Sequence, residues 1–122
     1  MPEKTILLVD DSPTELRLMT TALQGKGYNL VFAHDGEEAL EQATRQRPSL
    51  MLLDVVLPKK NGFQVCRQLK TSPDTKGIKI ILVSSKSQDT DRFWGLKQGA
   101  DDYLTKPYQD KELVASVERA LH

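Results

Sequence analysis

The chain has 122 residues, of which 39% are hydrophobic and 28% are charged, and its 17 basic and 17 acidic side chains give a formal net charge of zero. This length fits one domain with its own core, and the balanced charge argues against a general nucleic-acid or membrane-surface binder. With Cys66 as the one cysteine, the chain forms no internal disulfide and no thiolate zinc site. We therefore expect a single domain over residues 1–122, in the cytoplasm, without nucleic-acid contact or membrane insertion.

Five short apolar runs favour β-strands, and the segments between them carry signals that start helices. Nearly unbroken apolar runs are typical of parallel strands that helices cover on both faces. Ser12, Asp35 and Asn61 are N-cap residues, and the first of these is followed by a proline at the first helical position. In chain order the pattern predicts a strand at 5–9, a helix from 12, a strand at 30–33, a helix from 35, a strand at 50–53, a helix from 61, a strand at 78–83, a helix at about 88–98, a strand at 103–105 and a helix at about 110–121.

Strands that alternate with helices predict an α/β fold, in which a parallel sheet carries helices on both faces. Ligands of such open sheets bind beyond the carboxyl ends of the strands. The residues that directly follow the predicted strands are therefore the candidates for a site. They are Asp10, Asp11, Asp54, Ser84 and Lys106.

Three carboxylates at one edge of a sheet need a counter-charge. Two carboxylates ~4 Å apart repel by about 4 kcal/mol at an effective dielectric constant of 20. Lys106 supplies one positive charge, and an oxygen-rich donor set suits Mg²⁺. A carboxylate beside a metal ion and an amine can be a ligand, or it can be a nucleophile that attacks phosphorus.

Motifs at four strand ends resemble the receiver domain of two-component response regulators, of the stand-alone chemotaxis-regulator type. They are LVDDS at 8–12, LDVVLP at 53–58 followed by NG at 61–62, VSS at 83–85, and GADDYLTKP at 99–107. The resemblance covers essentially the whole chain and implies a flavodoxin-like (βα)5 doubly wound sheet of strand order 2-1-3-4-5. It also implies a cis peptide bond between Lys106 and Pro107. The segment 93–100, FWGLKQGA, resembles stand-alone regulators of twitching or phototactic motility.

The resemblance implies a role for each residue at the strand ends. Asp54 becomes the phosphoacceptor of a signalling protein whose only catalysis is its own phosphoryl uptake and loss. Asp11 becomes a direct Mg²⁺ ligand and Asp10 a ligand that acts mainly through water, with Mn²⁺ as a substitute metal. The backbone carbonyl of Val56 completes the protein ligands. Lys106 pairs with the phosphoryl group.

Partners follow from the same resemblance. A histidine kinase or its phosphotransfer domain would supply the phosphoryl group. Ser84 and Tyr103 would be the switch: the hydroxyl moves to the phosphoryl group, and the aromatic ring then turns inward. A downstream protein would read the face formed by the fourth helix, the fifth strand and the fifth helix, for which we single out Arg92, Trp94 and Tyr103. Phe93, on the same helix, is expected in the core.

Other functions remain open at this point. A receiver-like binding module that is never phosphorylated and a phosphate sink for a shared kinase are both compatible with these residues. A phosphatase of the haloacid dehalogenase type needs a second acid two residues after its nucleophile, where this chain has Val56. A flavin mononucleotide carrier needs bare backbone donors in its first loop, where this chain has Asp10 and Asp11.

Overall fold

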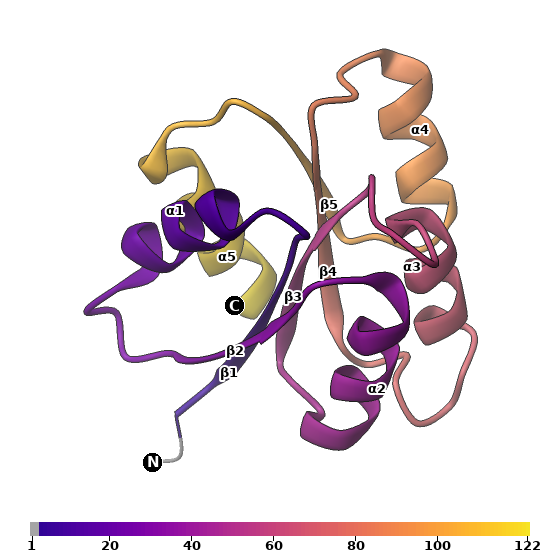
Figure 1. Cartoon of the computed structure of the whole chain (residues 1–122), viewed down its shortest axis with the longest axis horizontal. Coiled ribbons are helices and arrows are strands. Elements are labelled where there is room, and N and C mark those ends of the chain that lie inside the picture. The colour runs from indigo at the N-terminus through magenta and orange to yellow at the C-terminus, as the bar shows by residue number, and fades with distance from the viewer. Residues whose placement is uncertain (1–2) are drawn as a thin grey trace.

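The computed structural model describes residues 3–122, in which five β-strands alternate with five α-helices (Figure 1). Each predicted strand is present, and no strand boundary moves by more than one residue. None of the described helices is long and apolar enough to cross a membrane. The elements are β1 Thr5–Val9, α1 Pro13–Leu23, β2 Asn29–Ala33, α2 Gly36–Gln46, β3 Leu50–Asp54, α3 Gly62–Lys70, β4 Lys79–Ser84, α4 Asp89–Lys97, β5 Asp102–Thr105 and α5 Asp110–Leu121.

All five strands are parallel and lie in the order β2-β1-β3-β4-β5, as the resemblance implied. The register sets the strand ends side by side. Val9 is paired with Ala33 and Leu53, and Ser84 is paired with Thr105. The residues that follow β1, β3, β4 and β5 therefore meet at one edge of the sheet.

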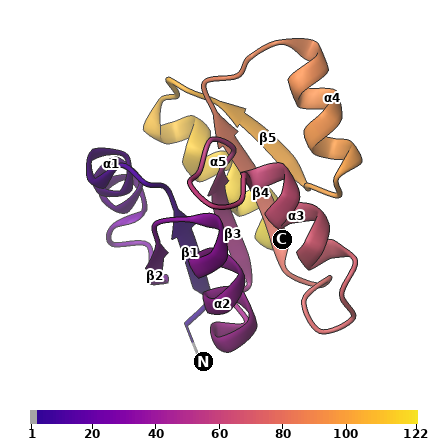
Figure 2. The same ribbon diagram turned by 45° about the vertical axis from the view of Figure 1, so that its right-hand side comes forward.

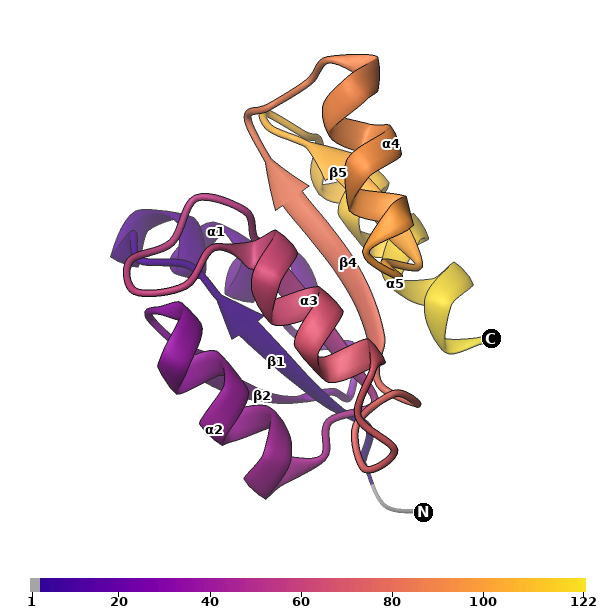
Figure 3. The ribbon, with the colours of Figure 1, turned by 90° about the vertical axis from the view of Figure 1, so that its right-hand side faces the viewer.

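Helices cover both faces of the sheet and enclose two apolar clusters (Figures 1 and 2). α1 and α5 lie on one face, and α2, α3 and α4 lie on the other (Figure 3). The central strands β1 and β3 are almost completely buried, as expected. The expectation of full coverage is wrong for β2, because this strand lies at the edge of the sheet and leaves Phe32 40% exposed.

The predicted caps place the helix starts close to the strand ends. Ser12 Oγ accepts a hydrogen bond from the Glu15 N–H at 3.3 Å, and Asp35 caps α2 in the same way. Asn61 and Gln64 form a reciprocal capping box at the start of α3. Such caps satisfy N–H groups that the first turn of a helix leaves without partners.

Helix α4 differs from the other helices because its one buried residue is a glycine. A Cβ atom on Gly95 would lie 2.9 Å from Leu82 Cδ1 and 2.9 Å from Tyr103 Cδ2, so the backbone of the helix rests directly on these side chains. The expectation that Phe93 belongs to the core is wrong, since this side chain is 61% exposed. Close backbone contact at Gly95 turns the neighbouring positions of α4 outward.

Candidate functional site

Three aspartates gather at the carboxyl ends of β1 and β3. One carboxylate oxygen from each of Asp10, Asp11 and Asp54 lies within 4.8 Å of the others. Asp10 and Asp54 are buried, with exposed fractions of 1% and 6%, whereas Asp11 is exposed. The parallel register brings together the acids that the sequence pattern singled out.

Lys106 is the cation closest to this cluster. Its Nζ donates to Asp10 Oδ2 at 2.8 Å and lies 3.6 Å from Asp54 Oδ1 and 3.9 Å from Glu15 Oε2. Asp10 Oδ1 accepts a second hydrogen bond, from the Ser12 N–H at 2.9 Å. The bond between Lys106 and Pro107 is cis, as the resemblance implied. One ammonium group thus faces several carboxylates, which leaves the cluster with excess negative charge.

The pKa values reflect this excess. Burial raises the pKa of Asp54 to about 6, and the charge of Asp10 adds to the rise, while Lys106 opposes it. Burial alone would lower the pKa of Lys106, but the hydrogen bond to Asp10 and the charges of Asp54 and Asp10 raise it overall. The neighbouring carboxylates thus contribute to the raised pKa of both groups.

The chain folds tightly around Asp54, and this requires a glycine. A Cβ atom on Gly62 would lie 2.3 Å from the Asp54 backbone oxygen, so only glycine lets α3 begin so close to the end of β3. Val56 lies between them, two residues after Asp54, with a side chain that is 57% exposed. The carboxylates of Asp10, Asp11 and Asp54 form an oxygen-only donor set, which fits a hard divalent cation such as Mg²⁺.

Ser84 and Tyr103 meet at the backbone of Lys86. Ser84 is fully buried, and its Oγ accepts a hydrogen bond from the Lys86 N–H at 3.1 Å. Tyr103 is 3% exposed, and its hydroxyl donates to the Lys86 carbonyl oxygen at 2.7 Å. The tyrosine ring therefore lies inward, under α4.

The residues expected on the partner face do not share one surface. Arg92 extends from α4 toward β5, where it donates to the Tyr103 carbonyl oxygen at 3.0 Å and lies 3.7 Å from Asp102. Trp94 lines a different hollow, between α3 and α4. The ring of Tyr103 is buried under α4, against Gly95.

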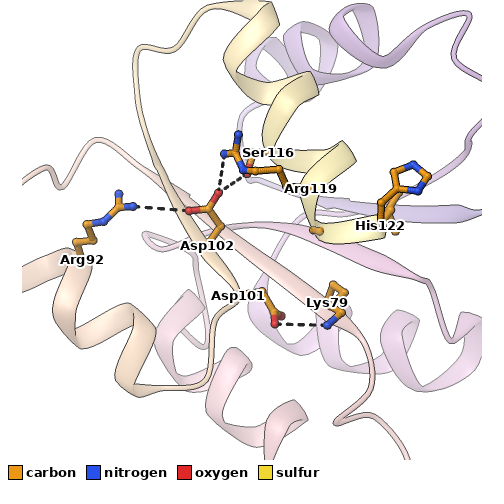
Figure 4. A pocket seen from close by; sticks show the side chains of 9 residues that line it. Lys79, Arg92, Asp101, Asp102, Ser116, Arg119 and His122 are labelled. Carbon is orange, nitrogen blue, oxygen red and sulfur yellow. Dashed lines mark hydrogen bonds and ion pairs between the residues drawn. The ribbon is translucent and has the colours of Figure 1, made fainter.

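A groove beside β5 is lined mainly by charged residues (Figure 4). At its centre Asp102 accepts a hydrogen bond from Ser116 Oγ at 2.6 Å and one from Arg119 at 3.4 Å. Asp101 and Lys79 lie 4.0 Å apart at its lower end. Asp102, unlike Asp54, accepts several close hydrogen bonds.

Sequence reasoning missed three residues at the mouth of the acidic cluster. Glu15, Leu18 and Tyr108 line a cavity of about 460 Å³ together with Lys106 and Pro107. Leu18 is 53% exposed and lies two residues after the buried Leu16, off the apolar stripe of α1. An apolar residue off the buried face of a helix indicates a surface contact, so Leu18 could have been found from the sequence. The place of Tyr108 depends on the path of the loop after Pro107, which composition does not indicate.

Comparison with known proteins decides the family. A family model of the response regulator receiver domain matches residues 6–118. The chain belongs to this family. It is therefore a signalling module of two-component systems and not an enzyme of the usual kind.

Receiver domains that resemble this chain occur alone and as parts of longer proteins. Protein PilH of Pseudomonas aeruginosa is 41% identical over 116 residues, which cover 95% of this chain and 96% of that protein. The regulatory protein PhoP of Bacillus subtilis, described as controlling alkaline phosphatase synthesis, is 41% identical over 97% of the chain, but this chain spans only 48% of its length. The structure of a putative response regulator from Chloroflexus aurantiacus is 34% identical and superposes with a TM-score of 0.93 over 98% of both chains.

Proposed function

We propose that the chain is switched by a phosphoryl group that Asp54 accepts from a histidine kinase or from its phosphotransfer domain. The observation that carries this proposal is the cluster of Asp10, Asp11 and Asp54, whose oxygens lie within 4.8 Å of one another with Lys106 at its edge. A carboxylate oxygen of Asp54 forms the new bond to phosphorus while the bond from phosphorus to the donor's histidine nitrogen breaks, and that nitrogen keeps the electron pair.

The other residues at the strand ends have separate roles in metal binding and in charge neutralisation. Both oxygens of Asp10 already accept hydrogen bonds, one from Lys106 and one from the Ser12 N–H, whereas Asp11 is exposed. This supports Asp11 as a direct metal ligand and Asp10 as a ligand acting mainly through water, with the Val56 carbonyl beside them. Mg²⁺, or Mn²⁺ in its place, supplies the positive charge that the cluster lacks. Lys106 is placed to neutralise oxygens of a phosphoryl group on Asp54.

Access to Asp54 favours a protein donor. Leu18, Pro107 and Tyr108 place apolar surface beside Lys106, on the side of the cluster formed by α1 and the loop before α5. A small acyl phosphate does not need such a surface. A protein that carries a phosphohistidine would use it to bury apolar side chains of its own.

The output would pass from Ser84 to α4. A phosphoryl group on Asp54 would offer Ser84 Oγ a charged acceptor, and Lys86 connects this hydroxyl to Tyr103 through its backbone N–H and carbonyl. Tyr103 in turn lies under Gly95 of α4. A change at Asp54 would thereby alter the surface formed by α4, β5 and α5, which a downstream protein reads by contact.

The test is incubation of the protein with acetyl phosphate and Mg²⁺, followed by intact mass spectrometry. We expect the wild-type chain to gain the mass of one phosphoryl group, and to gain none when a chelator removes the metal. Asp54→Asn should gain none under either condition. Asp102→Asn is the matched control, since it removes the charge of a buried carboxylate elsewhere in the sheet and should leave the gain intact.

Two results would contradict the proposal. Phosphorylation of Asp54→Asn to the same extent as wild type would show that another residue is the acceptor. A wild-type chain that stays unmodified with a small donor and with a histidine kinase would instead be a binding module that is never phosphorylated.

A further inference from the structure

A hollow of about 360 Å³ lies between α3 and α4, apart from both the acidic cluster and the groove beside β5. We call it the α3–α4 groove. Its accessible lining is mostly apolar, and Trp94, the one tryptophan of the chain, is 54% exposed there. Its lining residues are Asn61, Phe63, Gln64, Arg67, Trp94 and Gln98.

The large apolar side chains of α4 are not buried in the core of this domain. Phe93, Trp94 and Leu96 are 61%, 54% and 43% exposed, although the helix has only nine residues. Gly95 makes the close contact with the sheet instead. An exposed tryptophan that lines a hollow marks a surface where proteins bind, since tryptophan is enriched among the residues that dominate binding energy.

The charge around the groove is positive. Arg67 is the charged residue among those that line it, whereas Lys97, three residues after Trp94, lies outside the lining. α3 contains no acidic residue. Within residues 3–122 neither Arg67 nor Lys97 has a carboxylate partner, and Lys97 lies 5.5 Å from the centre of the Phe93 ring instead.

We propose that the α3–α4 groove is a docking site for an acidic segment of a partner protein. An apolar side chain of that segment lies against Trp94, and a carboxylate of the segment faces Arg67. A second copy of this chain fits poorly, because a two-fold contact through this groove would bring two copies of Arg67 into one interface. The site goes beyond the phosphoryl switch and does not require it.

The groove can be tested with a synthetic peptide, because Trp94 reports on it directly. The probe is a helix-forming peptide of about 15 residues with leucines along one face, glutamates elsewhere and no aromatic residue. The control peptide replaces each glutamate with lysine. We expect the acidic peptide to shift the tryptophan emission of the full chain to shorter wavelength, with saturation below about 1 mM. The basic peptide should leave the emission unchanged.

Variants then assign the binding to the proposed contacts, read by anisotropy of a labelled acidic peptide. Arg67→Glu should weaken binding about tenfold, and Trp94→Ala about thirtyfold. Lys111→Glu makes the same change of net charge on an exposed residue of α5 and should have no effect. Amide chemical shifts that move on binding should map to α3 and α4.

Three outcomes would overturn the inference. The acidic peptide could fail to bind, or it could bind Arg67→Glu as tightly as wild type. The chain could also form a dimer in sedimentation experiments that Trp94→Ala dissociates, and the groove would then be a contact between copies. None of these results depends on whether Asp54 accepts a phosphoryl group.

Discussion

Asp54 and Asp102 belong to the same sheet but lie at opposite ends of their strands, the first at the end of β3 and the second at the start of β5. Burial raises the pKa of Asp54 to about 6, and the charge of Asp10 adds to this rise. Burial also acts on Asp102, yet hydrogen bonds from Ser116, the Tyr103 N–H and Arg119 outweigh it and lower the pKa. The surroundings of these two aspartates thus shift their pKa values in opposite directions.

The difference teaches that burial alone does not decide the direction in which the pKa of a carboxyl group shifts. Asp102 receives donors at 2.6 and 2.8 Å, from Ser116 and from its neighbour's backbone, whereas Lys106 lies 3.6 Å from Asp54. A buried carboxylate without matched donors is costly for the fold and is available for a ligand or for chemistry. The acidic cluster at the strand ends therefore keeps negative charge that its neighbours do not balance, whereas the carboxylate of Asp102 is balanced by its donors.

The largest expected effect is that two isosteric substitutions change the free energy of unfolding in opposite directions. Asp54→Asn should stabilise the metal-free protein at pH 7 by roughly 2–3 kcal/mol, since it removes a buried charge whose pKa is raised. Asp102→Asn should destabilise it by about 1 kcal/mol, since it removes a charged acceptor. Urea unfolding of both variants in a chelating buffer measures the two changes. If both substitutions changed the free energy of unfolding in the same direction, the contrast between Asp54 and Asp102 would be wrong.

The pH dependence sharpens the same contrast. The pKa of Asp54 is about 6 in the folded chain against 3.8 for an unperturbed group, so its cost is complete above pH 6 and disappears as the pH falls toward 4. The gain from Asp54→Asn should fade over that interval. Asp102 has a lowered pKa, so its contribution is complete at neutral pH and is lost only as the pH falls below the ordinary range of an aspartate.

Much of this site could be predicted from the sequence, because parallel topology aligns strand ends. Apolar runs located all five strands, and Asp10, Asp54 and Lys106 then had to meet at one edge. The surroundings of Asp102 could not be predicted in this way. They depend on the turn of α5 that brings Ser116 to β5, and no pattern along the chain records that contact.

The error at Phe93 has a different physical cause. Helix periodicity is recognised from apolar side chains that face the core, but α4 turns a glycine toward the sheet. A pattern that counts side chains then assigns the burial to the wrong residue. The ring of Tyr103, which is 3% exposed, packs under the same glycine.

Ser84→Ala tests whether the two regions communicate. A hydrogen bond to a charged acceptor contributes about 1.5–3 kcal/mol, and a loss of ~2 kcal/mol shifts a two-state equilibrium about thirtyfold. Phosphorylation of Asp54 should survive the substitution. The amide shifts that phosphorylation causes at Tyr103 and residues 93–98 should become much smaller. Ser84→Thr should restore them, and Ser85→Ala, an exposed neighbour, should not alter them. If phosphorylation caused the same amide shifts in Ser84→Ala as in the wild type, Ser84 would not connect the acidic cluster to α4.

Gly95→Ala tests the contact at the other end of that connection. The new methyl group would lie 2.9 Å from Leu82 Cδ1 and from Tyr103 Cδ2, so the helix or the ring must move. Overpacking destabilises a protein by about 1–3 kcal/mol, and the better helix propensity of alanine stabilises the helix by about 1 kcal/mol. We expect a net loss of about 1–2 kcal/mol in urea unfolding, together with shifted Tyr103 resonances. Gly77→Ala is the control, since it meets no atom within 4 Å. A stabilised Gly95→Ala chain would contradict the close packing of α4.

The smallest effect is expected at Asp11, which belongs to the acidic cluster but is exposed. Water screens its repulsion with Asp54, so Asp11→Asn should change the metal-free stability by no more than about 0.5 kcal/mol, in the stabilising direction. Its affinity for Mg²⁺ should nevertheless fall by at least about tenfold, because a direct ligand is lost. Thermal unfolding in a chelating buffer and calorimetric titration with Mg²⁺ measure the two quantities separately. Asp74→Asn, another exposed aspartate outside the cluster, should change neither. A marked loss of metal-free stability in Asp11→Asn would mean that this carboxylate supports the fold as Asp102 does, and the contrast between the two regions would then fail at its exposed member.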